Sequence, residues 1–331
     1  MNRNFEALHK LVETKEANIC EITVMKGEEI LYEDFWNGFM KGDALNVMSV
    51  TKSIMSLLTG IAIDQGAIHS VDDSVLSYFP DYKPKGNDQT IRQVTIRHLL
   101  TMTAPYKYWT EPWKKVFTSD DWTRAALDLL GGRKITGRFK YATLGLQILS
   151  GIIENATGRK LIDFANEYLF APLGIERLAG HEPVSREDQM NYITSTEPRG
   201  REWFLDPKGC ATAGWGILLS ATDLAKIGVC VLQGGIYQGK RLFSESYVKE
   251  MSTPYLHLGR QFGYMSYGYL WWIPHKDSQT IAAIGDGGNV IYVNPEKQIV
   301  VGVASALKPR VFDRVDFIEN VIIKQLSDMI G

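Results

Sequence analysis

Residues typical of β-strands lie near both ends of this 331-residue chain. Two such runs, 19–25 and 29–36, flank a short turn that contains Gly27. Four others, YGYLWWI, TIAAIG, NVIYVN and QIVVGVAS, follow residue 265, with a turn at 294–297 between the last two. Neither group has enough neighbours to bury its own faces. We therefore expect the two ends of the chain to form one antiparallel sheet.

Elsewhere, apolar residues recur at helical spacing between loops that contain Pro and Gly. This pattern predicts helices at 4–14, 45–66, 94–102, 120–130, 143–157, 160–169, 215–232 and 311–330. The last helix would cover one side of the sheet with a single apolar face, made of Val315, Ile318, Ile322, Leu326 and Met329.

Together these patterns predict one α/β (α+β) domain over residues 1–331, an antiparallel sheet flanked by helices. One lobe would consist of about 1–68 plus 255–331, and the inserted, mostly helical lobe of about 69–254.

Composition excludes several classes of partner. Hydrophobic residues make up 45% of the chain, enough for a large core. A net charge of −2 and the lack of a basic run argue against nucleic acid. The N-terminal stretch lacks the apolar core of a signal peptide, and no stretch reaches about 18 uncharged apolar residues. We therefore expect a cytoplasmic protein that does not contact membranes.

The residues that most often bind metals are scattered. Cys20, Cys210 and Cys230 have no metal-type spacing, which suits buried thiols in a reducing compartment. His98 and His181 have no ligand partner at a suitable spacing. We expect neither a metal nor a cofactor, and the sequence does not indicate an oligomeric state.

The segment 45–66 carries a candidate catalytic pair. Ser49 lies at the predicted helix start, where unpaired N–H groups and the helix dipole stabilise a developing oxyanion. Lys52 follows at i+3 spacing, so its amine can reach the serine hydroxyl. In a dry site the neutral amine is favoured and can take the serine proton. Alternatively, Ser49 only caps the helix and Lys52 is solvated, because Ser-x-x-Lys alone is a weak motif.

Two later stretches could complete such a site. Tyr141 precedes the predicted helix at 143–157 and could act as a base or proton relay, although a half-buried tyrosine more often packs its ring and bonds its hydroxyl. Gly285 to Asn289 join two predicted strands, and their glycines would allow a close approach to the Asn289 N–H. A glycine-rich hairpin turn is the alternative.

In this order and at these separations, the three stretches resemble the serine β-lactamase and penicillin-binding-protein superfamily, in particular its esterase, class C β-lactamase and D-peptidase branch. The resemblance runs through nearly the whole chain: MSVTKSIMSLLTGIAIDQGAI, TIRHLLTMTA, YATLGLQILSGIIENATG, AGWGILLSATDLAKIG, YGYLWW and GDGGNVIYVNPEKQIVV. It implies a β-lactamase/transpeptidase-like fold with the site between the lobes. It also implies that Ser49 is the acylated nucleophile, Lys52 its base and Tyr141 the proton relay, with the N–H groups of Ser49 and Asn289 as the oxyanion hole.

Two positions depart from the family pattern. Thr143 stands where the second motif usually has asparagine, and Asp286 where the third usually begins with lysine, histidine or tryptophan. An acid there would repel a substrate carboxylate. We therefore expect Thr143, Asp286, Gly287 and Gly288 to contact a neutral or positively charged substrate.

Aromatic residues cluster in the loop 105–113. Trp109 and its neighbours could wall an apolar acyl pocket, or they could be core packing between the lobes.

These features predict a serine hydrolase that works through an acyl-enzyme, a carboxylesterase or amidase of small substrates. Two alternatives remain open. One is a β-lactamase or D-amino-acid peptidase. The other is a penicillin-binding-like sensor that does not turn over.

Overall fold

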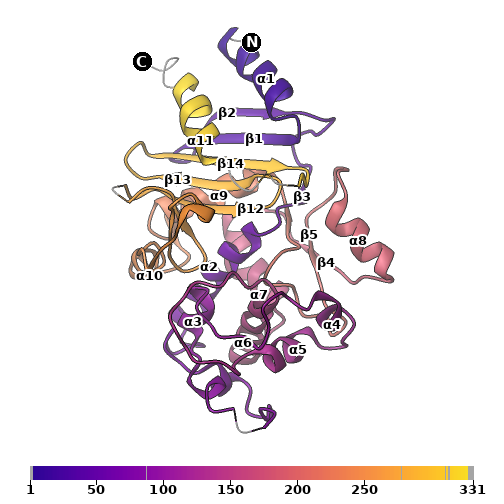
Figure 1. Ribbon diagram of the computed structural model, residues 1–331. Coiled ribbons are helices and arrows are strands. Elements are labelled where there is room, and N and C mark those ends of the chain that lie inside the picture. The colour runs from indigo at the N-terminus through magenta and orange to yellow at the C-terminus, as the bar shows by residue number, and fades with distance from the viewer. Residues whose placement is uncertain (1–2, 87, 277, 310, 312–313, 327–331) are drawn as a thin grey trace.

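The computed structural model describes residues 3–86, 88–276, 278–309, 311 and 314–326 (Figure 1). Both chain ends enter one eight-stranded antiparallel sheet, as predicted. Its strands follow the order β2 (Glu29–Phe35), β1 (Ile19–Lys26), β14 (Ile299–Ser305), β13 (Asn289–Asn294), β12 (Ile281–Gly285), β11 (Trp272–Ile273), β10 (Ser266–Tyr267) and β9 (Leu256–His257).

Helices cover both faces of this sheet (Figure 1). On one face lie α1 (Arg3–Lys15) and α11 (Val315–Phe317), which continues through the π-helical segment Ile318–Ile323. There the hydroxyl of Tyr292 donates a hydrogen bond of 2.8 Å to Glu319. The predicted apolar face is buried at Val315, Ile318, Ile322 and Leu326, whereas Met329 lies outside the described residues.

The opposite face is covered by α9 (Ala221–Leu232). Gly228 lies so close to β14 that a Cβ atom there would be 2.5 Å from a methyl group of Val300. The helix packs on the sheet because Gly228 meets the Val and Ile side chains of β13 and β14 at close range. The sequence range predicted for the helical lobe includes this helix, and the division of the chain into two lobes stays a prediction.

The remaining helices are α2 (Val50–Asp64), α3 (Ile96–Leu100), α4 (Trp113–Phe117), α5 (Trp122–Leu129), α6 (Gln147–Thr157), α7 (Leu161–Ala165), α8 (Arg186–Thr194) and α10 (Glu245–Met251). The sequence patterns did not predict α4, α8 or α10, which are short. None of the described helices is long and apolar enough to cross a membrane.

Short strand pairs join the segments around these helices. They are β3 (Leu45–Asn46) with β6 (Leu218–Leu219), β4 (Ala179–His181) with β5 (Glu202–Phe204), and β7 (Ile236–Tyr237) with β8 (Lys240–Arg241). Because residues 45–46 pair with β6, the helix predicted at 45–66 begins only at Val50.

The segment YGYLWWI was predicted as one strand, but it folds back on itself. Tyr267 of β10 pairs with Trp272 of β11 in antiparallel register. Leu270 in the connection has φ of 61°, and a Cβ atom on Gly268 would clash with the carbonyl oxygen of Met251. The strand-like composition of this segment did not reveal the tight reversal of the chain, because the reversal depends on packing against α10.

Candidate active site

Ser49 lies immediately before α2 and is partly exposed. Its side chain makes no capping hydrogen bond, so helix capping does not account for this serine. The preceding residue, Met48, has φ of 51°, an unfavourable value for a residue with a side chain. A hydrogen bond of 3.0 Å from the Met48 N–H to the Asn46 side chain supports this conformation. The strained turn therefore fixes the direction in which the Ser49 side chain points.

Lys52 is buried and its amine is fixed by two contacts. The Nζ atom lies 2.7 Å from Ser49 Oγ and 2.6 Å from the carbonyl oxygen of Gly214. Burial lowers the pKa of Lys52 to about 7, while the negative charges of Glu111 and Asp286 oppose this shift. A large fraction of the amine is therefore neutral at neutral pH and able to accept the Ser49 proton.

Tyr141 is half-buried beside both residues. Its hydroxyl interacts with the Ser49 side chain, which lowers the pKa of the phenol, and its ring centroid lies 4.9 Å from Lys52 Nζ. Burial raises the pKa of Tyr141 well above its ordinary value, and the charges of Asp286 and Glu111 act in the same direction. The phenol therefore stays protonated at neutral pH, which favours proton relay over the tyrosinate base that the sequence also allowed.

The third predicted stretch forms a tight turn between β12 and β13. Gly285, the last residue of β12, abuts the start of α2, because a Cβ atom there would lie 3.0 Å from the Ser49 amide nitrogen. The carbonyl of Gly285 accepts the N–H of Gly288 on the hairpin side. In a trans peptide the next N–H, that of Asp286, points the opposite way, out of the hairpin.

Asn289 differs from its predicted role in the oxyanion hole. It has no exposed surface, and its side chain donates to the carbonyl of Asp286 and accepts from the N–H of Ser305. A backbone N–H at this buried position is out of reach of a ligand. Among the described residues, neither the N–H of Ser49 nor that of Asp286 has a hydrogen-bond acceptor. Asp286 is therefore the better candidate for the second donor.

Gly287 and Gly288, in the same turn, were predicted to contact substrate, but the structure places other parts of the protein against them. The space beside Gly288 is filled by the side chain of Arg314, and that beside Gly287 by the carbonyl of Ala306. Gly287 and Gly288 have positive φ, of 85° and 84° respectively. The glycines are needed for the turn and for close packing against the protein itself. Asp286, in contrast, is exposed at the tip of the turn.

Thr143 and Trp109 lie in different surroundings. Thr143 is half-buried and packs against Gly214, where a Cβ atom would be 2.5 Å from the threonine methyl group. Trp109 is 85% exposed and its ring lies 4.1 Å from the Arg133 guanidinium carbon. Trp109 therefore does not wall a closed pocket in this conformation.

Two functional candidates were missed by sequence reasoning. One is the carbonyl of Gly214, which accepts the Lys52 amine. The other is Glu111, whose carboxylate accepts the N–H of Leu144 at 2.7 Å. Burial raises the pKa of Glu111, whereas the N–H of Leu144 and the charge of Lys52 lower it. No motif spacing marks either residue. The only sequence signal for Glu111 was its acidic side chain within the aromatic loop 105–113.

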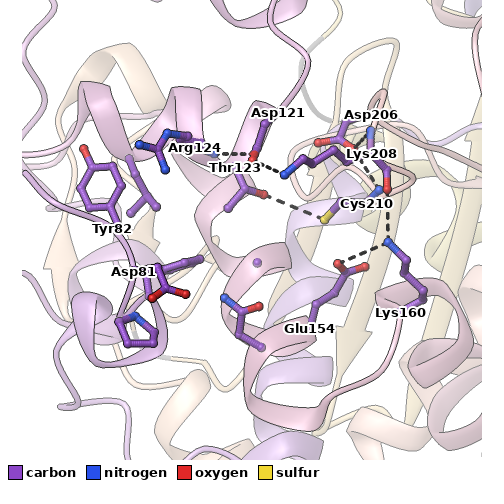
Figure 2. Close-up of a pocket in the computed structure, with 15 residues that line it drawn as sticks. Asp81, Tyr82, Asp121, Thr123, Arg124, Glu154, Lys160, Asp206, Lys208 and Cys210 are labelled. Carbon is purple, nitrogen blue, oxygen red and sulfur yellow. Dashed lines mark hydrogen bonds and ion pairs between the residues drawn. The ribbon is translucent and has the colours of Figure 1, made fainter.

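A separate cavity of about 490 Å³ lies beside α5 and α6 (Figure 2). Two ion pairs line it: Lys208 with Asp121 at 3.0 Å, and Lys160 with Glu154 at 4.0 Å. None of the predicted catalytic residues lines it. Among the described residues, no group of three or more His, Cys, Asp or Glu is arranged to hold a metal ion.

Known proteins resemble this chain in sequence and in structure. 6-Aminohexanoate-dimer hydrolase of Paenarthrobacter ureafaciens is 26% identical over 301 residues, which cover 84% of this chain and 70% of that protein. The octameric penicillin-binding protein homologue from Pyrococcus abyssi matches with a TM-score of 0.69 at 22% identity, over 93% of this chain and 74% of that chain. EstCE1, a hydrolase with promiscuous acyltransferase activity, matches with a TM-score of 0.68 at 15% identity, over 98% and 97% of the two chains.

The structural likenesses confirm the predicted β-lactamase-like fold. The family model described as Beta-lactamase matches residues 22–322, nearly the whole chain. This protein therefore belongs to the Beta-lactamase family of serine hydrolases.

Proposed function

We propose that this protein hydrolyses small esters or amides through an acyl-enzyme formed on Ser49. The observation that carries the proposal is the buried Lys52 amine, 2.7 Å from Ser49 Oγ, with its pKa lowered to about 7. A solvated lysine would be protonated at neutral pH and unable to act as a base. The similarity to a 6-aminohexanoate-dimer hydrolase and to EstCE1 supports hydrolysis of an acyl compound.

In the first half-reaction, Ser49 Oγ attacks the substrate carbonyl carbon as Lys52 accepts the hydroxyl proton. The bond between the carbonyl carbon and the leaving group then breaks. The proton passes from Lys52 through the Tyr141 hydroxyl to the departing oxygen or nitrogen. In the second half-reaction, water gives a proton to the same relay and attacks the acyl carbon. The acid is released and the Ser49 hydroxyl is restored.

The negative charge that develops on the carbonyl oxygen needs two donors. We assign these to the N–H groups of Ser49 and Asp286. Both lack an acceptor among the described residues, and Gly285 brings the two backbones together.

Charge near the site selects the substrate class. Asp286 and Glu111 both act electrostatically on Lys52, so the site carries two carboxylates beside one amine of lowered pKa. Such a site disfavours substrates with a carboxylate near the scissile bond, including β-lactams, and favours neutral or amine-bearing ones. The chemistry implied by the name 6-aminohexanoate-dimer hydrolase, cleavage of an amide between amino-acid units, fits this class.

The test compares a short-chain p-nitrophenyl ester, a p-nitroanilide of an ω-amino acid and a chromogenic cephalosporin, using the native chain and Ser49→Ala. We expect steady, serine-dependent cleavage of the ester or anilide and little cephalosporin turnover. Faster cephalosporin cleavage would instead support a β-lactamase. A burst of product equal to the enzyme, followed by no turnover, would support the sensor.

A further inference from the structure

Glu111 is tied to the segment that carries Tyr141. Its carboxylate accepts the N–H of Leu144 at 2.7 Å, and the backbone of Thr143 also acts to lower the pKa of this carboxylate. The Tyr108 hydroxyl lies 3.5 Å from the same oxygen. The N–H of Leu144, at the start of a helical turn, is thus satisfied by a carboxylate from a distant loop.

That segment in turn abuts the residue that holds Lys52. A Cβ atom on Gly214 would be 2.5 Å from the Thr143 methyl group and 2.8 Å from its carbonyl oxygen, so the two backbones touch. The Gly214 carbonyl accepts the Lys52 amine at 2.6 Å. One continuous set of contacts therefore runs from Glu111 through Thr143 and Gly214 to Lys52.

Glu111 also contributes charge at this place. The carboxylates that act on Lys52 are those of Glu111 and Asp286, and the Tyr141 ring and Ser49 hydroxyl complete its surroundings. The groups around Glu111 itself are Lys52, Lys140, Tyr106, Tyr108 and Tyr141. The amine of Lys140 donates to the carbonyl of Tyr108, and among the ion pairs of the described residues none joins Lys140 to Glu111.

We propose that Glu111 is a positioning residue of the hydrolytic site, which holds the Tyr141–Thr143 segment against Gly214 and keeps a negative charge beside Lys52. This inference rests on the proposed function. It assigns a role to a residue that none of the three sequence stretches contains.

The two parts of this role separate in two variants. Glu111→Gln keeps an oxygen that accepts the Leu144 N–H but removes the charge. Since the charge of Glu111 raises the pKa of Lys52, its loss should move the midpoint of the kcat/KM profile to lower pH by about half a unit, with kcat on the alkaline plateau nearly unchanged. Glu111→Ala also loses the hydrogen bonds. It should show the same shift and a kcat about tenfold lower at every pH, with a smaller change in KM.

Glu13→Gln, at an exposed position on α1, is the matched control for removal of a carboxylate. Melting curves followed by circular dichroism establish that each variant is folded. A Glu111→Gln profile that coincides with the native one would overturn the charge role, and a Glu111→Ala variant with native kcat would overturn the positioning role.

A second readout separates this inference from the proposed function. Covalent labelling of Ser49 by a fluorophosphonate, followed by intact-mass measurement over pH, requires the neutral Lys52 amine but no turnover. Labelling that shifts to lower pH in Glu111→Gln, in a protein without steady hydrolysis, would support the inference and refute the proposed function. Steady hydrolysis with no shift would do the reverse.

Discussion

Gly285, at the end of β12, lies directly against the backbone of Ser49. A Cβ atom at this position would be 3.0 Å from the Ser49 amide nitrogen and would clash with the carbonyl oxygen of Val47. The sheet and the start of α2 therefore meet at Ser49, and the contact requires a residue without a side chain.

Gly285→Ala should consequently impair catalysis more than folding. The added methyl group meets backbone atoms that cannot rotate away, so it should cost about 1–3 kcal/mol of stability. It should also displace the Ser49 N–H and lower kcat by about a hundredfold. The control is Gly259→Ala, because a Cβ atom at Gly259 meets nothing within 4 Å and its φ is −84°. Ester turnover and thermal melts of both variants provide the comparison, and equal activities would refute the proposed contact.

The pH dependence of hydrolysis should report Lys52. Its pKa is lowered to about 7 by burial, and only the neutral amine acts as a base. Hence kcat/KM should rise with pH through about 7 and level off above about 8. Lys52→Arg, which stays protonated, should be inactive over the whole range. A midpoint near the ordinary lysine pKa of about 10 would mean that Lys52 is not the base.

The KM for charged substrates should depend on Asp286. This residue is exposed at the tip of the β12–β13 turn and acts electrostatically on Lys52. Asp286→Lys should lower KM for esters that carry a carboxylate and raise it for esters that carry an amine, each by a few-fold because solvent screens the charge. Neutral esters serve as the control. If KM changes equally for all three substrates, Asp286 does not face the substrate.

Asn18 stabilises the turn that contains the Asp286 N–H through side-chain hydrogen bonds. Its side-chain amide donates at 2.8 Å to the carbonyl of Gly287 and at 2.8 Å to that of Ala306. Asn18→Ala should lower kcat about tenfold through a displaced oxyanion donor, with KM little changed. In the control, Asn155→Ala removes a hydrogen bond of 2.8 Å that the Asn155 side-chain amide donates to the Tyr78 carbonyl, at another site. Similar kcat losses in both variants would point to a general loss of stability.

Folding stability should depend on the protonation of Glu21. This residue on β1 is 1% exposed, and burial raises its pKa to about 8 although it accepts the N–H of Ala221 at 2.9 Å. In the unfolded chain a glutamate titrates near about 4.3. Since the folded-state pKa is the higher one, the stability that protonated Glu21 contributes is complete below about 4.3 and is lost as pH rises to about 8.

Glu21→Gln keeps an acceptor for the Ala221 N–H and cannot ionise. Denaturant unfolding at pH 5, 7 and 9 should therefore show a weaker decline of stability with pH in this variant than in the native chain. The same decline in both proteins would show that other groups cause it.

Features that depend on neighbours in sequence could be predicted from the sequence. The Ser49 and Lys52 side chains meet because residues three apart share a helix face. Strand-like runs at both ends indicated one sheet, and β1 pairs with β14. The buried face of the C-terminal helix also followed from helical periodicity at each of its described positions.

Features that depend on distant contacts were decided only by the tertiary structure. Lys52 and the Gly214 carbonyl are 162 residues apart, and Glu111 and Leu144 are 33 apart. Likewise, the burial of Asn289 and the packing of α9 on the sheet follow from neighbours that no local pattern specifies. Sequence periodicity constrains which side chains share a face of one element, whereas close packing between elements decides which N–H, carbonyl or carboxylate reaches the site.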